Sequence, residues 1–523
     1  MILIVRGPDG QRRMQVEDAE AIGRQLKNAF GVESLCVFMQ PDAVDKIDEE
    51  QSPDALGLKN GSVVYVQYDV PAGMHSSNRQ ASAAQDLPVS EGAARKRTTE
   101  RGIHRERDEM MCQHDSRAMC SHCAPLDPWD ERYHRENMIK YLSFGSYKEM
   151  MRSNKKEMCA ESYTVAVCGD HGQNTRCARC QERSIILMPQ TFRMIDHVEF
   201  DGQYLVENFI RGWKDSRRQR VGFLVGRYRE YDLVPLGMKA VVSGIWEPEQ
   251  ENYPDGFVVL DECSEFLCGS GLEVVGMIYT DIHVEGGEMR SDKVARDYFL
   301  SSLEIQFIAR MQQKHPYVMT DGGRTDEFGS RFVTIVATAD AEGNVVLKEY
   351  QVSTQCMALV KEDAVLATEE PRMFMAAKDI VYRTKSNAEM VKADPYFPGD
   401  FFIVRLTHGC RHNPMFSNEE YVPAKMSRKR MAECFGGDFS MQKLSSFSLL
   451  MKIRGVLGKW KELFNSIVSG DGRMFEEVLR SKEFKVFASG LEKYVCKSWA
   501  CERCTFINEG SLNECKMCRA EKM

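Results

Sequence analysis

The chain has 523 residues and a formal net charge of −8, with 43% hydrophobic and 28% charged residues. This length allows several domains, and the composition is ordinary for globular protein. The acidic balance and the lack of a basic stripe argue against a nucleic-acid binder, and no apolar run reaches the roughly 18 residues of a membrane span.

The chain contains eighteen cysteines, which could either bind metal or form disulfides. The first ten residues, MILIVRGPDG, lack the charged start and long apolar region of a signal peptide. We therefore expect a cytosolic or nuclear protein whose cysteines bind metal rather than form disulfides.

Residues 1–70 are predicted to form a β-grasp domain. Two short strand patterns flank the turn residues Pro8-Asp9-Gly10, and Ile22 and Leu26 share one face of the helix that follows. The sequence LGLKNG at 56–61 resembles ubiquitin-like and UBX-like domains, although the Phe-Pro-Arg loop of typical UBX domains is absent. A generic α+β domain is the alternative. Residues 71–108, rich in Ser, Ala, Gln and mixed charges, are predicted to be a flexible linker.

Two metal-binding patterns occupy residues 109–188. Each combines three cysteines with one histidine and ends in Cys-x-x-Cys, which suits a closed tetrahedral zinc site. The two sets are Cys112, His114, Cys120 and Cys123, and then Cys168, His171, Cys177 and Cys180. Spacing alone leaves open whether His114 or His122 belongs to the first set.

Residues 189–330 resemble an MPN domain, the fold of the JAMM zinc isopeptidases. An apolar run at 274–279 predicts a buried strand, and residues 298–311 could form a helix. Active members end this strand in His-x-His and continue to Ser-x-x-Asp, which together hold a zinc ion that activates water. The matching positions here are Tyr279, Asp281 and Glu304. The resemblance therefore implies a domain that has lost its catalysis, with a deubiquitinase using unusual metal ligands as the alternative.

Residues 331–495 are assigned to a C-terminal domain that is largely helical at its end. Leucines, Trp460 and Phe464 recur there at helical spacing. The trio His408, Cys410 and His412 could suggest a metal or catalytic site, but no acid in the sequence orients it. Cys263 and Cys268 lack paired partners and are interpreted as structural.

Residues 497–523 carry two Cys-x-x-Cys knuckles, formed by Cys501, Cys504, Cys515 and Cys518. They predict a four-cysteine zinc ribbon. Together with the preceding Trp and the Thr-Phe pair, they resemble the Npl-type zinc finger, a ubiquitin-binding module. This resemblance implies that Thr505, Phe506 and Met517 contact ubiquitin; a purely structural ribbon is the alternative.

Several longer blocks resemble the nuclear protein localization protein 4 family. They include CARCQ from Cys177, TFRMIDHVEF from Thr191, GFLVGRY from Gly222 and FGSRFVT from Phe328. The resemblance implies a non-enzymatic adaptor that binds polyubiquitin. With the ubiquitin fusion degradation protein 1 subunit, it would bring substrates to the valosin-containing protein, an AAA ATPase that unfolds them for proteasomal or ER-associated degradation.

The whole chain is thus expected to be a multidomain α+β protein. Its predicted parts are a UBX-like β-grasp, a zinc-finger insertion, a catalytically dead MPN α/β core, a mixed C-terminal domain and a terminal zinc ribbon. Three structural Zn²⁺ sites are expected, with no transmembrane segment and no nucleic-acid partner. The family resemblance implies a cytoplasmic and nuclear location, peripheral to the endoplasmic reticulum membrane on recruitment.

Overall fold

The computed structural model describes most of the chain. The described residues are 2–7, 10–16, 21–30, 36–38, 47, 51–58, 62–67, 102–105, 107, 110–115, 118–158, 162–163, 184–260, 264–321, 324–383, 390–411, 414–417, 431–432, 439–492, 499–508 and 514–520. Within them, no helix combines the length and apolar character needed to cross a membrane.

The N-terminal part forms a small mixed sheet with one helix. Its elements are β1 (Ile2–Gly7), β2 (Gly10–Gln15), α1 (Ile22–Phe30), β3 (Cys36–Phe38) and β4 (Val63–Gln67). The strand order is β2-β1-β4-β3, and the two central strands run parallel. Leu3, Val5 and Val64 of the sheet and Ile22 and Leu26 of α1 are fully buried, as their spacing predicted.

The segment from 102 to 158 docks on the rest of the molecule through one helix and the short strand before it. It contains α3 (Glu131–Glu136), β5 (Leu142–Ser143) and α4 (Phe144–Ser153). The Phe144 ring stacks on Phe328, and the Tyr147 ring stacks on Phe192. The hydroxyls of Ser143 and Ser146 both lie within hydrogen-bond distance of the Pro235 carbonyl, at 2.6 and 2.8 Å.

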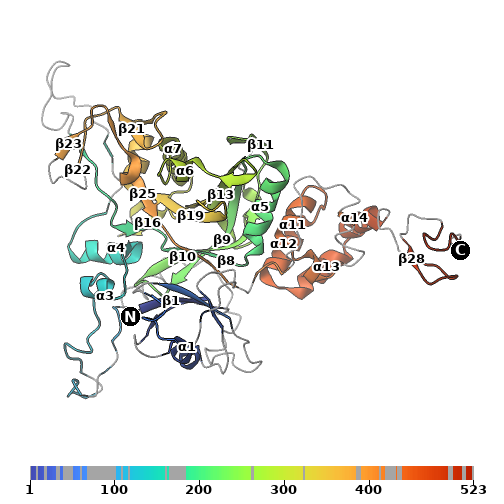
Figure 1. Cartoon of the computed structure of the whole chain (residues 1–523), viewed down its shortest axis with the longest axis horizontal. Coiled ribbons are helices and arrows are strands. Elements are labelled where there is room, and N and C mark those ends of the chain that lie inside the picture. The colour runs from blue at the N-terminus through green and yellow to red at the C-terminus, as the bar shows by residue number, and fades with distance from the viewer. Residues whose placement is uncertain are drawn as a thin grey trace.

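A single eight-stranded sheet forms the centre of the molecule (Figure 1). In chain order its strands are β8 (His197–Phe200), β9 (Val221–Tyr231), β10 (Gly237–Trp246), β13 (Glu273–Asp281), β18 (Val333–Ala339), β19 (Val345–Val352), β25 (Ile403–Arg405) and β26 (His408–Cys410). In space the order is β25-β19-β18-β13-β9-β10-β8-β26. The predicted strand at 274–279 is confirmed as part of β13.

Helices cover both faces of this sheet, because alternate residues of its buried strands are apolar on each side. On one face, α5 (Tyr204–Ser216) packs Leu205 and Phe209 against Leu224 and Ile278. The opposite face carries α7 (Ser302–Lys314) and α8 (Thr354–Lys361), which belong to a second core with Phe223 and Tyr279. The sheet is therefore the middle layer of an α/β sandwich.

The two outer strands of the sheet are consecutive in sequence. β25 pairs with β19, and β26, which starts only three residues after β25 ends, pairs with β8 at the other end of the strand order. The Leu406 amide donates to the Glu349 carbonyl, and the Val198 amide donates to the Thr407 carbonyl. Residues 403–410 thus join the two edges of the sheet.

Short strands, hairpins and short helices surround the sheet. They are β6 (Ile185–Ile186), β7 (Phe192–Arg193), β11 (Gln250–Asn252), β12 (Phe257–Val259), η1 (Glu265–Leu267), β14 (His283–Glu285), β15 (Glu288–Arg290), α6 (Asp292–Ala295), β16 (Val318–Asp321), β17 (Arg324–Glu327), β20 (Val365–Ala367), β21 (Met373–Ala376), β22 (Ile380–Arg383), β23 (Met390–Lys392), β24 (Tyr396–Pro398) and η2 (Gly399–Phe402).

Two sequence expectations need correction here. The domain boundary at 330/331 falls inside the central sheet, because β13 pairs with β18 and β19 continues the same sheet. The helix predicted at 298–311 begins at Ser302, where Ser301 and Glu304 form a reciprocal capping box, and it extends to Lys314.

The C-terminal helices are α10 (Met441–Leu444), α11 (Phe447–Ile453), α12 (Trp460–Ser469), α13 (Gly472–Arg480) and α14 (Lys482–Glu492). They lie between the sheet and the C-terminal segment, which carries β27 (Trp499–Ala500) and β28 (Ile507–Asn508) (Figure 1). Phe447 packs directly on Gly244 of β10, where an added Cβ would come within 2.5 Å of the ring. The predicted packing of Trp460 and Phe464 is confirmed, since both are buried.

Candidate functional site

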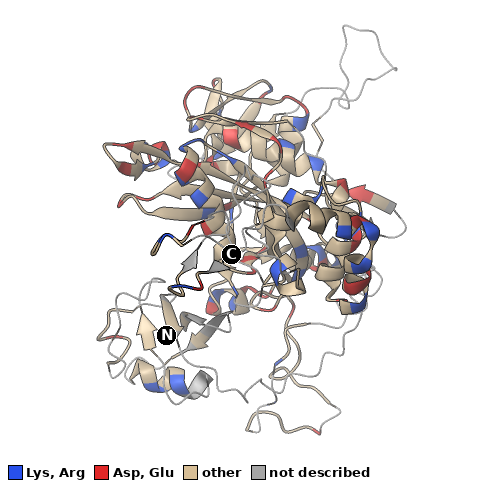
Figure 2. Ribbon diagram, turned by 90° about the vertical axis from the view of Figure 1, so that its right-hand side faces the viewer, with Lys and Arg blue, Asp and Glu red and all other residues tan. Residues whose placement is uncertain are grey.

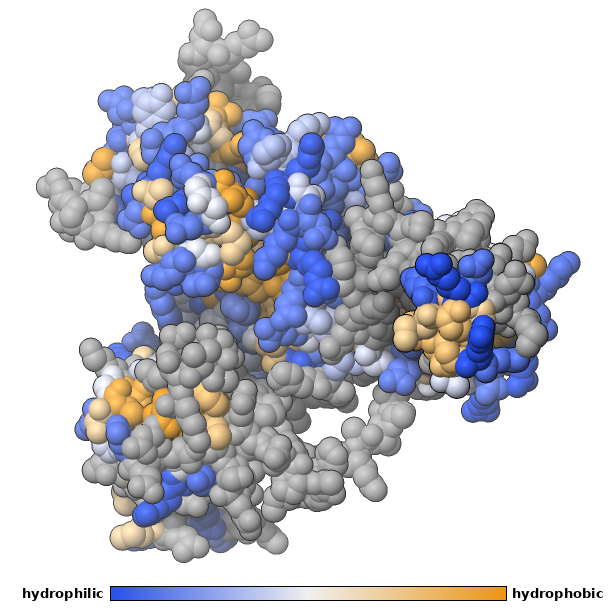
Figure 3. Space-filling view, turned by 45° about the vertical axis from the view of Figure 1, so that its right-hand side comes forward, coloured by the Kyte–Doolittle hydropathy of each residue, from blue (hydrophilic) through white to orange (hydrophobic). Residues whose placement is uncertain are grey.

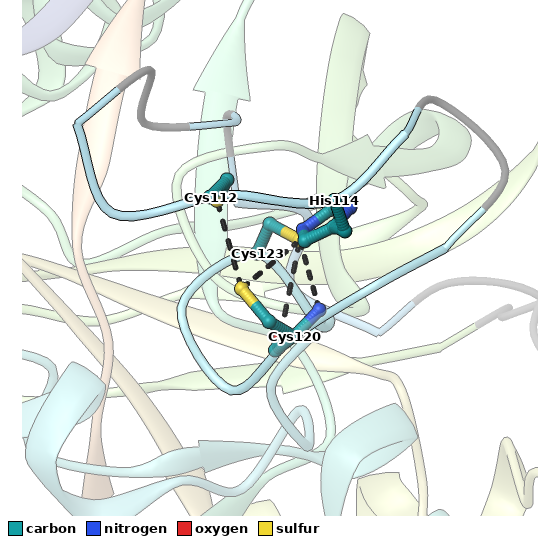
Figure 4. Close-up of side chains that lie close together, drawn as sticks. All are labelled: Cys112, His114, Cys120 and Cys123. Carbon is teal, nitrogen blue, oxygen red and sulfur yellow. Dashed lines mark hydrogen bonds between the residues drawn. The ribbon is translucent and has the colours of Figure 1, made fainter.

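Three places that the sequence analysis singled out can be compared in the described part of the chain. The first Cys/His set comes together in a loop closed by the pairing of Ile103 with Leu126 (Figure 4). The donor atoms of its four side chains all lie within 4.8 Å of one another, and they belong to Cys112, His114, Cys120 and Cys123. His122 is exposed and stands outside this cluster.

The His114 ring is oriented for metal binding. Its Nδ1 atom lies 2.9 Å from the Asp115 carbonyl, which fixes the proton on Nδ1, and its Nε2 atom lies 3.2 Å from the Cys123 sulfur. A carbonyl that holds the distal ring nitrogen is the usual outer support of a histidine metal ligand. The geometry therefore favours His114 over His122.

The loop also stabilises a thiolate. Backbone N–H groups of His122 and Cys123 lower the pKa of the Cys120 thiol to about 6. The guanidinium of Arg105 donates to the carbonyls of Ser121 and Ala124, at 2.6 Å in each case, and so fixes the backbone around the knuckle. The sequence did not predict this role of Arg105, because hydrogen bonds from a side chain to backbone carbonyls follow no residue pattern.

The second Cys/His set, Cys168, His171, Cys177 and Cys180, lies outside the described residues. The expectation of a zinc site there stays a prediction.

The terminal knuckles form a second cluster of donors, made of Cys501, Cys504, Cys515 and Cys518. The sulfurs of Cys501 and Cys518 are 3.4 Å apart, as are those of Cys504 and Cys515. The N–H of Phe506 favours the Cys504 thiolate, but burial and the other three thiols raise its pKa to about 12. A bound cation would stabilise the Cys504 thiolate and so lower this pKa. Four sulfurs grouped in this way suit zinc.

The proposed ubiquitin-contact residues lie on the outside of this ribbon. Thr505 is exposed, and the exposed fractions of Phe506 and Met517 are 39% and 71%. In Figure 3 apolar residues form small groups among hydrophilic ones, including a group on the side where Figure 1 places the C-terminal segment. Large apolar side chains exposed on so small a body are typical of a contact surface.

The degenerate MPN positions converge at one end of β13. The Tyr279 hydroxyl donates to Oε1 of Glu304 over 2.7 Å, and the Ser301 amide and hydroxyl both donate to its Oε2 atom. Burial, followed by the charge of Glu304, raises the pKa of Tyr279 well above its usual value, so the phenol stays protonated.

Lys293 of α6 enters the same cluster, and the sequence motif did not predict it. Its Nζ atom lies 2.8 Å from Asp281 Oδ2 and 2.6 Å from Glu304 Oε1. Burial disfavours the charged amine, but the carboxylates of Glu304 and Asp281 outweigh this and raise the pKa of Lys293. The donor set does not fit a catalytic zinc ion, because it has no imidazole and already contains a cation.

The remaining candidates form no metal cluster within the part of the chain that the structure describes. His408 pairs with the carboxylate of Glu349, while His412 and Cys263 lie outside the described residues. Cys268 is exposed and does not belong to either cluster of metal donors within the described residues.

Comparison with known proteins gives consistent matches. Residues 220–454 match the sequence model of the NPL4 family, and residues 93–217 match one described as "NPL4 family, putative zinc binding region". The nuclear protein localization protein 4 of Saccharomyces cerevisiae is 29% identical, over 90% of this chain and 96% of its own length. The protein of that name from Candida glabrata is 31% identical over 78% and 81%, and that from Schizosaccharomyces pombe is 29% identical over 88% and 93%.

Proposed function

The chain belongs to the NPL4 family, and from this premise we propose that it is a non-catalytic adaptor for ubiquitinated proteins. It would bind polyubiquitin and act with the ubiquitin fusion degradation protein 1 subunit. Together they would recruit substrates to the valosin-containing protein AAA ATPase, for unfolding and for proteasomal or ER-associated degradation. The observation that carries the proposal is the exposure of Phe506 and Met517 on a ribbon whose four cysteines could hold one zinc ion.

The ribbon supplies a ubiquitin contact of limited size. Apolar burial contributes about 25 cal/mol per Å², so two side chains and their surroundings favour weak binding to one ubiquitin. Several weak contacts along one chain can raise the overall affinity by roughly 10² to 10⁴. The adaptor would therefore prefer long chains over single ubiquitin.

We assign the remaining parts by the same proposal. The β-grasp unit, as a UBX-like domain, and the two Cys/His zinc sites would dock on the ATPase, with zinc serving structure rather than catalysis. The central α/β core would act as a catalytically dead MPN domain that holds the substrate's ubiquitin. The protein would act in cytoplasm and nucleus and at the endoplasmic reticulum surface when recruited.

Two other function classes are less well supported. A JAMM-type deubiquitinase would need a metal ion between Asp281 and Glu304, where the Lys293 ammonium already lies. A nucleic-acid binder would need basic residues gathered on one face. In the view of Figure 2, Lys and Arg are instead interspersed with Asp and Glu along the described chain.

A pull-down of lysine-48-linked ubiquitin chains by the purified full-length protein tests the proposal. Intact long chains should be retained in preference to single ubiquitin. Shortened chains would instead establish the deubiquitinase. Chains that are neither bound nor cut, even with the partner subunit added, would contradict the adaptor function.

A further inference from the structure

The polar cluster at the end of β13 contains two carboxylates that share one cation. Asp281 and Glu304 come from different elements, and both contact Lys293 Nζ. The exposed fraction of the Lys293 side chain is only 8%, against 34% for Asp281 and 19% for Glu304. Two carboxylates this close together would be costly without a cation, because like charges would face each other where water reaches them only in part.

The other polar atoms of this cluster fix the two carboxylates in place. The Ser291 hydroxyl donates to Asp281 Oδ2 over 2.9 Å, the same oxygen that Lys293 contacts. Glu304 accepts from Tyr279 and Lys293 on one oxygen and from Ser301 on the other. Removal of the ammonium group would therefore leave preorganised oxygen atoms around a space of cation size.

Lys293 lies in the segment between β13 and α7, and this segment holds it next to the two carboxylates. Ser291 caps α6, since its hydroxyl accepts from the Lys293 amide over 3.3 Å while it donates to Asp281. Asp281 therefore has two contacts in this segment: it accepts from Ser291, which caps α6, and it pairs with Lys293. The β14–β15 hairpin, which directly precedes Ser291 in the chain, would be anchored to the sheet through this cluster.

We propose that Lys293 is the permanent cation of this cluster: it occupies the place between Asp281 and Glu304 that a divalent metal ion could otherwise fill. The chain itself thus supplies the charge, and the cluster binds no metal while Lys293 is present. This inference does not depend on ubiquitin binding. If Lys293 is removed, the carboxylate oxygens of Asp281 and Glu304 would favour a hard ion such as Mn²⁺.

The test compares the full-length, zinc-loaded protein with its Lys293→Met variant, which keeps the apolar stem but loses the charge. Mn²⁺ binding is followed by electron paramagnetic resonance and thermal stability by the unfolding temperature. Mn²⁺ should leave the native protein unchanged. The variant should unfold several degrees lower, bind one additional Mn²⁺ and recover part of its stability on binding.

Two controls separate this effect from general loss of an ion pair. Lys239→Met removes a partly buried pair with Glu199, joined over 2.8 Å in the same sheet, and should gain no Mn²⁺ site. Lys293→Arg keeps the positive charge and should also bind none. If Lys293→Met does not fold, Lys293→Met combined with Asp281→Asn removes one charge of each sign and should fold.

Three results would overturn the proposal. They are a folded Lys293→Met variant that binds no Mn²⁺, a native protein that binds Mn²⁺ through Asp281, and a charge-balanced double variant that also fails to fold.

Discussion

Thr505 and Arg519 adopt the same left-handed backbone conformation, with φ of 56° at each residue. The amide of each donates to the carbonyl of the cysteine four residues earlier, Cys501 or Cys515, over 2.7 and 2.8 Å. The two knuckles of the ribbon therefore share the same backbone conformation at this position. Their side chains differ, because only the first knuckle continues into a Thr-Phe pair.

This repetition provides a matched test of the ubiquitin contact. Thr505→Gly with Phe506→Ala should keep zinc, since glycine accepts a positive φ without strain. Loss of the Phe506 ring should weaken chain binding by roughly 1–2 kcal/mol, about tenfold. The measurement is a titration of lysine-48-linked chains by calorimetry.

The control for this variant is Arg519→Gly, which makes the same backbone change in the other knuckle. It should bind chains like the native protein. Equal weakening in both variants, or loss of ATPase binding by the first, would refute the division of roles proposed here.

The first Cys/His cluster predicts a difference between two neighbouring histidines. His114→Ala should lower the zinc content of the purified protein by one ion, because Nε2 of His114 lies among the three thiols. His122→Ala should leave the content unchanged. Atomic emission spectroscopy measures both, and the opposite result would assign His122 as the ligand.

Asp196 predicts an unusual pH dependence of stability. Burial raises the pKa of this carboxyl to about 7 from 3.8, against the opposing effect of the Met238 N–H. Between these values the folded protein holds a proton that the unfolded chain releases, so the Asp196 contribution to stability falls as pH rises towards 7.

Asp196→Asn removes this titration and keeps an acceptor for the Met238 amide, which lies 2.9 Å from Oδ2 of Asp196. The variant should gain stability relative to the native protein on going from pH 5 to pH 8, by at most about 3 kcal/mol, because only the interval from pH 5 to about 7 contributes. Urea unfolding at both pH values measures the change. A constant difference between the two proteins would show that Asp196 is ionised throughout.

Two glycines in helices should respond oppositely to alanine. A Cβ at Gly212 in α5 would lie 1.7 Å from Nη1 of Arg220, which pairs with Glu247. Gly212→Ala should therefore destabilise by about 1–3 kcal/mol. Gly490 in α14 has open space, so Gly490→Ala should stabilise by up to about 1 kcal/mol. Thermal unfolding compares them, and similar shifts would contradict the steric argument.

Local patterns predicted much of the fold and of the metal donors. Cys-x-x-Cys spacing sufficed for the ribbon because its ligands are close in sequence. A continuous apolar run located β13, and alternation beside a turn signal located strands of the N-terminal sheet. The 330/331 boundary failed because sheet pairing between β13 and β18 joins strands separated by α7. Lys293 was missed because its role depends on how a loop folds back onto two carboxylates, which no spacing rule encodes.

Residues 403–410, which join the two edges of the central sheet, affect how the protein can be synthesised. Until this segment leaves the ribosome, β19 and β8 both present unpaired backbone groups, and such edges are templates for pairing with other chains. Closure also depends on contacts between distant parts of the sequence, which form slowly. The nascent chain is therefore most prone to aggregation just before its sheet is complete, and a fragment ending before Ile403 would keep that hazard permanently.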